Sequence, residues 1–235
     1  MSQRKDRIRV GLLGCGTVGT GVLEVIEANA SDIEARLGVP LRVTRIAVSD
    51  LDKARDPIVP LELLSDSASE LIADPEIDII VEVIGGQEPA GTLISEALAA
   101  GKHIVTANKA LIAMHGQEIF SVARQMGVCV LYEAAVAGGI PIIKSIREGL
   151  VGNVITRITG ILNGTSNFIL SEMASKKQPR GFDEVLREAQ EKGYAEADPS
   201  FDVSGFDAAH KITILAMIGF GVRVGIESAR VEGIS

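Results

Sequence analysis

The sequence of 235 residues has no tryptophan, only two cysteines and few aromatic residues, which make up 3% of the chain. Together with a net charge of −8, this shortage excludes stacking platforms and a basic surface for nucleic acid. Apolar runs that would form a membrane span or a secretion signal are also missing. We therefore expect a cytoplasmic protein with no nucleic-acid partner and no membrane partner.

Hydrophobic residues make up 46% of the chain, and their spacing alternates between that of strands and that of helices. Short apolar runs predict strands at residues 8–14, 41–50, 77–85, 103–108 and 128–135. Helical spacing separates them at residues 18–29, 89–101 and 109–127. Apolar strands separated by helices predict a parallel sheet covered on both faces, a doubly wound, Rossmann-type α/β domain over residues 1–135.

The pattern of predicted strands and helices changes after the glycine pair Gly138 and Gly139. The pattern predicts a helix at residues 141–150, a strand at 153–162, a polar loop at 163–167 and then mostly helix. This change marks a domain boundary, and we expect a second domain of the α+β class over residues 136–235.

Three glycines in "GLLGCGTVGTGV", Gly14, Gly16 and Gly19, follow the first predicted strand and open a helix. In this context the spacing indicates a dinucleotide-binding turn: Gly14 permits the tight turn, Gly16 admits a phosphate, and Gly19 lets helix and strand pack closely. A purely structural glycine turn is the alternative. The other residues of the predicted turn are Leu13, Cys15, Thr17 and Val18.

The second predicted strand ends in Ser49 and Asp50, where an acidic residue commonly binds the adenine ribose of NAD. Asp50 follows Gly19 by 31 residues, with residues 31–40 taking up the extra length. Ser49 can hydrogen-bond a 2′-phosphate and Lys53 or Arg55 can add charge, whereas Asp50 would repel that phosphate. NAD and NADP therefore both stay open, as does an ordinary solvated turn.

Two further segments follow strands of the same sheet, and ligands of such sheets lie beyond the carboxyl ends of the strands. Ile84 and Gly85 follow the third strand, and Lys109 lies where the fourth strand gives way to a helix. A cation is unfavourable at the positive end of a helix dipole, which favours a functional lysine over a surface one.

The segment "KGYAEADPSFDVSGFDAAHK" collects carboxylates and a lysine beside turn residues. Asp207 and Lys211 have helical spacing, so they share one face of a helix that continues into an apolar run. They form either a weak surface pair or, if partly buried, a general acid held beside a carboxylate. Glu196 lies on a turn stiffened by Pro199 and suits a substrate ammonium. Calcium is disfavoured because the acidic spacing lacks alternate-residue ligands.

These residues together resemble the homoserine dehydrogenase family nearly from end to end. The family interconverts L-homoserine and L-aspartate 4-semialdehyde with NADPH or NADH, in the route to threonine, methionine and isoleucine. The resemblance therefore implies an NAD(P)-dependent oxidoreductase that acts on a CH–OH group of a small-molecule substrate and forms a homodimer. The motifs that carry it are "GLLGCGTVGTGV", "TANKAL", "YEAAVAGGIPII", "ILNGTSNFIL", "GYAEADPSFDVSGFDAAHK" and "VEGIS".

The resemblance also implies roles for individual residues. Lys211 is the acid/base that donates a proton to the aldehyde oxygen, and Lys109 is a second lysine that also contacts the coenzyme. Glu196 and Asp207 hold the amino end of the substrate, and Asp202 supports them. Residues that line the substrate pocket are Tyr194, Gly164 and Thr165.

In the family, the segment "EAAVAGG" binds a sodium ion through main-chain carbonyls. These would belong here to Glu133, Val136, Gly138 and Ile140, and a tight hinge is the alternative for the same segment.

The chain departs from the family in two respects. Many members carry an arginine where this chain has Ser49, which leaves the preference for NADP open. Members also continue beyond the position of Ser235, so the second domain is expected to be incomplete, without a regulatory domain.

Two rival functions from other classes remain to be weighed. One is a dinucleotide-binding fragment, or a redox sensor, without turnover. The other is an acylating aldehyde dehydrogenase, which needs a nucleophilic cysteine with a base nearby. It is excluded because Cys129 falls inside an apolar predicted strand and Cys15 in the phosphate loop. Neither cysteine has metal-ligand spacing or implies a disulfide framework.

Overall fold

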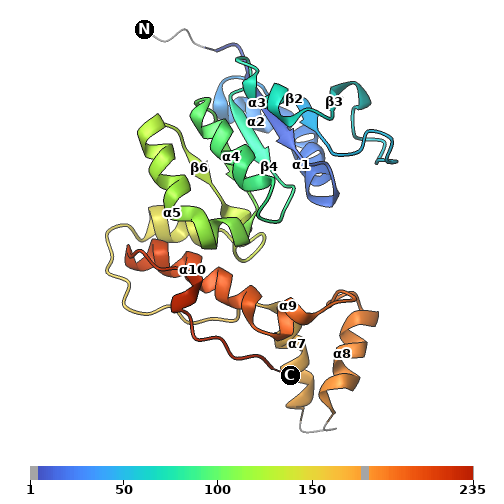
Figure 1. The fold of residues 1–235 in the computed structure, drawn as a ribbon, viewed down its shortest axis with the longest axis vertical. Helices are drawn as coiled ribbons and strands as arrows, with labels where there is room; N and C mark the ends of the chain where they lie inside the picture. The colour runs from blue at the N-terminus through green and yellow to red at the C-terminus, as the bar shows by residue number, and fades with distance from the viewer. Residues whose placement is uncertain (1–4, 176–179, 235) are drawn as a thin grey trace. The chain divides into compact units, whose positions relative to one another are not determined.

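The computed structural model describes residues 5–175 and 180–234 (Figure 1). The chain divides into two compact units, Met1–Ala135 and Val136–Ser235. Residues 1–4, 176–179 and Ser235, which fall in the predicted domains 1–135 and 136–235, lie outside the described residues, and so does the last residue of the "VEGIS" motif.

The first unit is built on a parallel sheet whose strands have the order β3-β2-β1-β4-β5-β6 within the described residues. The strands are β1 (Ile8–Leu13), β2 (Leu41–Ala47), β3 (Leu64–Ser65), β4 (Ile79–Glu82), β5 (His103–Thr106) and β6 (Val130–Leu131). β1 pairs with both β2 and β4, so the strand order reverses beside β1. This order is typical of dinucleotide-binding Rossmann folds, which bind their ligand at that reversal.

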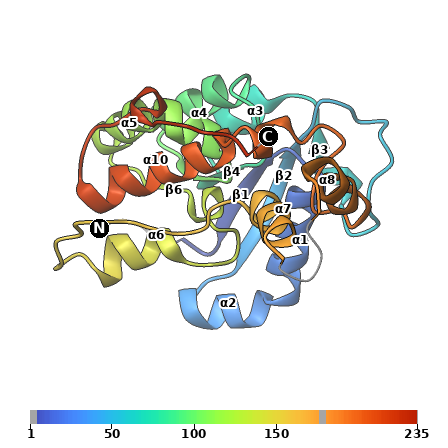
Figure 2. The ribbon, with the colours of Figure 1, turned by 90° about the horizontal axis from the view of Figure 1, so that it is seen from below.

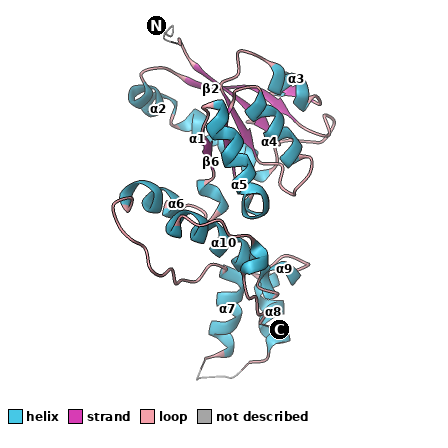
Figure 3. Ribbon diagram, turned by 60° about the vertical axis from the view of Figure 1, so that its left-hand side comes forward, coloured by secondary structure: helices cyan, strands magenta, loops and turns pink. Residues whose placement is uncertain are grey.

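Helices cover both faces of this sheet. They are α1 (Thr17–Ala28), α2 (Ala30–Leu37), α3 (Ala68–Ala73), α4 (Ala90–Ala99) and α5 (Lys109–Met126), with short 3-10 turns η1 (Leu61–Leu63) and η2 (Glu133–Ala135). Right-handed crossovers place α1 and α2 on one face and α3, α4 and α5 on the other (Figures 2 and 3). The doubly wound α/β fold predicted from the apolar strands is confirmed.

Three details of the first unit differ from the sequence-based predictions. The strand predicted at residues 128–135 is wrong beyond β6, because the chain turns into η2 at Glu133. β3 and α3 were not predicted, since their two and six residues are too short to show a period. The extra length before Asp50 forms α2.

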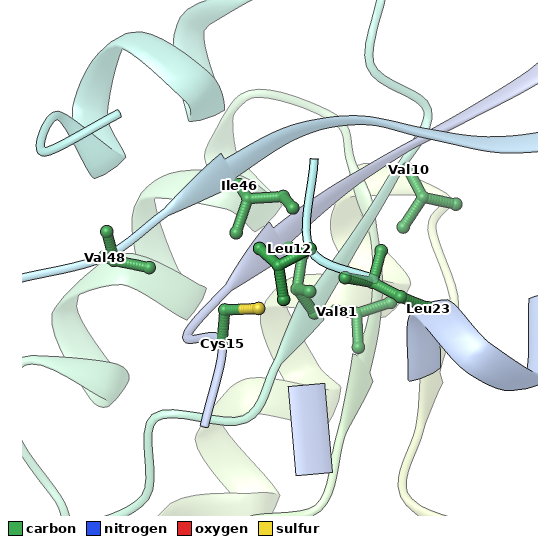
Figure 4. Packing of buried hydrophobic residues seen from close by; sticks show 8 residues of the cluster. Val10, Leu12, Cys15, Leu23, Ile46, Val48 and Val81 are labelled. Carbon is green, nitrogen blue, oxygen red and sulfur yellow. The ribbon is translucent and has the colours of Figure 1, made fainter. Parts of the chain in front are cut away.

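Valine, leucine and isoleucine side chains from β1, β2 and β4 form the core beside the glycine-rich turn, together with Cys15 and with Leu23 of α1 (Figure 4). Cys15 is buried there as a small apolar side chain. Cys129 corrects a prediction, because it precedes β6 and is exposed instead of lying inside a strand. Its backbone N–H donates to Nδ1 of His103.

The described part of the second unit is mainly helical. Its elements are α6 (Ile142–Lys144), the π-helical turn η3 (Ser145–Gly149), α7 (Gly164–Met173), α8 (Phe182–Glu191), α9 (Ser200–Val203), α10 (Phe206–Phe220) and the 3-10 turn η4 (Ile226–Ser228). Residues of α7, α8 and the turn after α8 share a small core. Within residues 5–175 and 180–234, no helix has the length and apolarity that crossing a membrane requires.

The strand predicted at residues 153–162 is wrong in the described structure, where this segment has no ladder partner. A strand exists only when a neighbour accepts and donates its backbone hydrogen bonds. Ile155 and Ile158 instead approach Gly219 of α10, where a Cβ would lie 2.9 Å from a methyl group of Ile158. Val154 and Ile161 are exposed.

Candidate functional site

The glycine-rich turn between β1 and α1 has the geometry of a phosphate-binding turn. Gly14 has φ +94°, a conformation that disfavours a side chain, and a Cβ there would lie 3.0 Å from the carbonyl oxygen of Val83. A Cβ on Gly19 would lie 2.5 Å from the carbonyl oxygen of Gly14, whereas one on Gly16 would meet open space. Gly16 is the N-cap of α1 and no described side chain caps this end, so its backbone amides can face an anion.

Arg55 connects this turn to the turn after β2. Its guanidinium donates from Nη1 to the Cys15 carbonyl at 3.0 Å and from Nη2 to the Asp50 carbonyl at 2.6 Å. Its Nε is buried and meets no hydrogen-bond partner among the described residues. The Asp50 carboxylate accepts the backbone amides of Asp52 and Lys53, and Ser49 is exposed beside it. A cation and a carboxylate thus both belong to the turn after β2, the segment that the sequence predicts to contact the adenosine ribose.

The ends of β4 and β5 lie at the same edge of the sheet. Ile84 and Gly85 follow β4, which pairs with β1, and Gly85 has φ +80°. Lys109 is half-buried and is the first residue of α5, which confirms the predicted position between the fourth strand and a helix. The structure thus brings these predicted residues to the carboxyl edge that also holds the glycine-rich turn.

Asp207 and Lys211 form an i,i+4 pair in α10, which confirms the pairing predicted from their spacing. Lys211 Nζ lies 2.6 Å from Asp207 Oδ2 and donates a second hydrogen bond, 2.7 Å long, to the Leu162 carbonyl. The side chains of Asp207 and Lys211 are 3% and 18% exposed, so this is a buried pair and not a weak surface one. Two of the three Lys211 N–H donors are used by these acceptors, which leaves one for a ligand.

Asn163 organises this cluster and was missed in the sequence. Its Nδ2 donates to Asp202 Oδ1 at 2.7 Å and to Asp207 Oδ2 at 2.8 Å. Its Oδ1 accepts the Ser166 amide and thereby caps α7. The sequence signal that could have identified Asn163 is its position at the start of a polar run before a predicted helix, where asparagine commonly caps the helix. We define the lysine–carboxylate cluster as Asn163, Asp202, Asp207 and Lys211.

The remaining predicted substrate residues lie outside these hydrogen bonds. Glu196 is exposed, and no described residue hydrogen-bonds to its carboxylate. Thr165 is buried and donates to the Tyr194 carbonyl at 2.6 Å, and Tyr194 itself is exposed. Gly164 is exposed at the start of α7. Hydrogen bonds from Ser200 lower the pKa of Asp198, which fits a structural role for this carboxylate before α9.

Replacing Asn163 by alanine is expected to lower the free energy of unfolding by about 2–4 kcal/mol. The variant loses a helix cap worth about 1 kcal/mol and two hydrogen bonds to carboxylates worth about 1.5–3 kcal/mol each before relaxation. Urea denaturation followed by circular dichroism measures the change. Asn167→Ala is the control, since Asn167 is exposed on the same helix; equal stabilities of the two variants would contradict the role of Asn163.

The segment with the predicted sodium ligands turns sharply. Ala137 and Gly138 have φ +62° and φ +57°, two successive left-handed residues. The Ile140 carbonyl already accepts the Ile142 amide at 2.8 Å, so one of its lone pairs remains for a cation. Val136 is buried and Glu133 half-buried. Main-chain oxygens suit a hard cation, and the backbone fits both a tight hinge and such a site.

Among the described residues, no three His, Cys, Asp or Glu side chains gather in a way that could hold a metal ion.

A parallel sheet of this order with a glycine-rich turn beside β1 defines a Rossmann-type dinucleotide-binding protein, and the second unit adds a buried lysine–carboxylate cluster. Residues 14–133 match the sequence model of the homoserine dehydrogenase NAD binding domain, and residues 141–235 match that of homoserine dehydrogenase. The chain belongs to the homoserine dehydrogenase family.

Individual relatives agree with this assignment. The homoserine dehydrogenase of Pseudomonas aeruginosa is 52% identical over 97% of this chain. A crystal structure of a homoserine dehydrogenase from Thiobacillus denitrificans has a TM-score of 0.91 and 56% identity, over 97% of this chain and 52% of its own. A hyperthermophilic archaeal homoserine dehydrogenase in complex with NADPH has a TM-score of 0.78 and 29% identity, over 95% of this chain and 75% of its own. The chain spans about half the length of the curated relatives it matches.

Proposed function

We propose that this chain supplies the coenzyme-binding and substrate-binding units of a homoserine dehydrogenase, an NAD(P)-dependent oxidoreductase that acts on a CH–OH group. The reaction interconverts L-homoserine and L-aspartate 4-semialdehyde by hydride transfer, in the route to threonine, methionine and isoleucine. The observation that carries the proposal is the buried pair of Lys211 and Asp207, held by Asn163, in a chain that matches the family in both units.

Lys211 is the proposed acid/base. Reduction of an aldehyde needs a proton at the oxygen that becomes an alkoxide, and a bound nicotinamide supplies the hydride. The Lys211 ammonium donates that proton and stabilises the developing charge, while Asp207 and the Leu162 carbonyl hold it in place. Lys109, at the start of α5, is the proposed second lysine and also contacts the coenzyme.

The substrate carries an ammonium, and carboxylates of the second unit are its proposed partners. Glu196 is exposed, and no described residue donates to its carboxylate, so this carboxylate can accept from an amino group. Asp207 shares this task, and Asp202 supports it through Asn163. The proposed pocket-lining residues are Tyr194, Gly164 and Thr165.

For the coenzyme, the structural features favour a pyrophosphate at the N-terminus of α1 and an adenosine near Ser49 and Asp50. The Arg55 guanidinium supports a 2′-phosphate and the Asp50 carboxylate supports a ribose, so both NADP and NAD remain in the proposal. The proposed contacts of the phosphate-binding turn are Leu13, Gly14, Cys15, Gly16, Thr17, Val18 and Gly19, and those at the end of β4 are Ile84 and Gly85.

The proposal extends to a homodimer in the cytoplasm and to a sodium ion held by main-chain carbonyls of Glu133, Val136, Gly138 and Ile140. The fit of the sodium site rests on the two left-handed residues and on the remaining lone pair of Ile140.

The direct test is a titration of the 235-residue chain with NADPH and with NADH, followed by turnover with aspartate semialdehyde. Coenzyme fluorescence reports binding, and the loss of absorbance of the reduced coenzyme reports hydride transfer. We expect saturable binding of at least one coenzyme and turnover with the same one. Failure to bind either coenzyme would overturn the proposal.

A second candidate is a dinucleotide-binding fragment without turnover, which is favoured because the chain spans about half the length of its relatives. Binding of a coenzyme without hydride transfer, under conditions where a full-length relative turns over, would select this candidate.

A further inference from the structure

Glu82, the last residue of β4, has a fully buried carboxylate that the sequence did not single out. A buried carboxylate must be hydrogen-bonded to be tolerated, and its partners here belong to the predicted coenzyme edge. Oε1 accepts the backbone amides of Ile84 at 2.9 Å and Gly85 at 3.1 Å. Oε2 accepts the hydroxyl of Thr106, at the end of β5, at 2.5 Å.

These bonds continue into a closed ring. The Thr106 hydroxyl accepts a hydrogen bond from the backbone N–H of Asn108 at 3.0 Å. The side chain of Asn108 donates from Nδ2 to the Gly86 carbonyl at 2.5 Å. Asn108 Oδ1 also accepts the Leu111 amide and so caps α5. The ring therefore joins the loop after β4, residues 83–86, to residues 107–109, which lead from β5 into the first residue of α5.

The loop after β4 contains two successive glycines in left-handed conformations. Gly85 and Gly86 have φ +80° and φ +73°, and glycines in a loop have large conformational freedom when nothing holds them. The same loop adjoins the phosphate-binding turn, because a Cβ on Gly14 would lie 3.0 Å from the Val83 carbonyl oxygen and 3.2 Å from the Ile84 amide. The turn after β2, where the adenosine half is proposed to bind, contributes no member to the ring.

We propose that Glu82, Thr106 and Asn108 are positioning residues that hold residues 83–86 and 107–109 in the conformation that binds the nicotinamide half of the coenzyme. This inference rests on the proposed function, since it assumes that the sheet edge binds a dinucleotide. It predicts a selective defect in binding. Loss of the ring lowers the affinity for a ligand that carries a nicotinamide and leaves unchanged the affinity for a ligand that lacks one.

The test compares Thr106→Val with Thr106→Ser in the whole chain. Valine has nearly the shape of threonine but deletes the hydroxyl, which leaves the Glu82 carboxylate without one donor and the Asn108 amide without its acceptor. Serine keeps both hydrogen bonds. The probes are NADPH and 2′-phospho-ADP-ribose, which is NADPH without its nicotinamide.

We expect Thr106→Val to weaken NADPH binding by about tenfold and to leave 2′-phospho-ADP-ribose binding unchanged, with Thr106→Ser like the unaltered chain. In the free protein, the Thr106→Val change should speed amide hydrogen exchange at Ile84, Gly85 and Asn108 by about tenfold. Glu82→Gln offers a donor where Thr106 needs an acceptor. This variant should likewise bind NADPH more weakly and 2′-phospho-ADP-ribose equally well, and it replaces Thr106→Val in the test if Thr106→Val does not fold.

If Thr106→Val lowered the affinities for both ligands equally, the ring would have a general structural role and the inference would be overturned. Unchanged NADPH affinity in Thr106→Val would also overturn it. If the unaltered chain binds neither NADPH nor NADH, the proposed function itself fails. The exchange rates of the free variants then decide separately whether the ring holds the two loops, and unchanged rates would refute it.

Discussion

Turnover is expected to fall by about 10³-fold when Lys211 is replaced by arginine, while NADPH binding persists. A positioned general acid contributes about 10²–10⁴-fold, and the guanidinium of arginine does not release its proton near neutral pH. Arginine keeps a cation beside Asp207, which is 2% exposed, so the buried carboxylate stays paired. The loss of reduced-coenzyme absorbance with aspartate semialdehyde gives kcat, and coenzyme fluorescence gives the affinity.

Lys211→Ala should lose as much activity as Lys211→Arg and should also have a lower free energy of unfolding. It removes the Lys211 cation from the buried Asp207 carboxylate, to which Asn163 still donates, and breaking a buried pair typically costs about 3–5 kcal/mol. The matched control is Lys192→Ala, since Lys192 is an exposed lysine of the same unit that pairs with Glu188. Activity of Lys211→Arg equal to that of Lys192→Ala would refute the role of Lys211 as the acid/base.

The sequence predicted the first unit well because the strands of a parallel sheet are buried on both faces. Such strands appear as continuous apolar runs, and β1, β2, β4 and β5 each matched one. The glycine fingerprint then located the reversal of strand order, since a tight turn between a strand and a helix needs residues without side chains. β3 and β6, with two residues each, carry too short a pattern to be bounded from the sequence.

The second unit was harder to predict because its key contacts are distant in the sequence. Asn163 meets Asp202 and Asp207 across 39 and 44 residues, and no local pattern encodes such a meeting. The pairing of Asp207 with Lys211 was predictable, because four residues of helix bring side chains to one face. The alternating residues 153–162 were misleading, since β periodicity specifies a pleated face but not the neighbour that makes it a strand.

The ring around Glu82 shows a further limit of sequence patterns. A glutamate between valines looks like an outward-facing position of a strand, and only the structure shows that Thr106 and two loop amides satisfy it. The same holds for Arg55, whose charge was evident while its two backbone acceptors, from Cys15 and Asp50, were not.

Replacing Gly19 by alanine is expected to lower NADPH affinity by about two orders of magnitude and the free energy of unfolding by about 1–3 kcal/mol. The added Cβ would lie 2.5 Å from the Gly14 carbonyl oxygen and 3.2 Å from its carbon, both backbone atoms that no side-chain rotation can remove. The overlap must push α1 away from β1, and the amides at the start of α1 then no longer converge on one pyrophosphate.

Gly21→Ala separates this clash from the general effect of a glycine-to-alanine change in α1. A Cβ on Gly21 meets nothing within 4 Å, and alanine favours a helix by about 0.5–1 kcal/mol over glycine. Gly21→Ala should therefore be slightly more stable than the unaltered chain and bind NADPH with the same affinity. Coenzyme titration and urea denaturation of the two variants measure both quantities. If Gly19→Ala binds NADPH as well as Gly21→Ala does, close packing at Gly19 does not shape the coenzyme site.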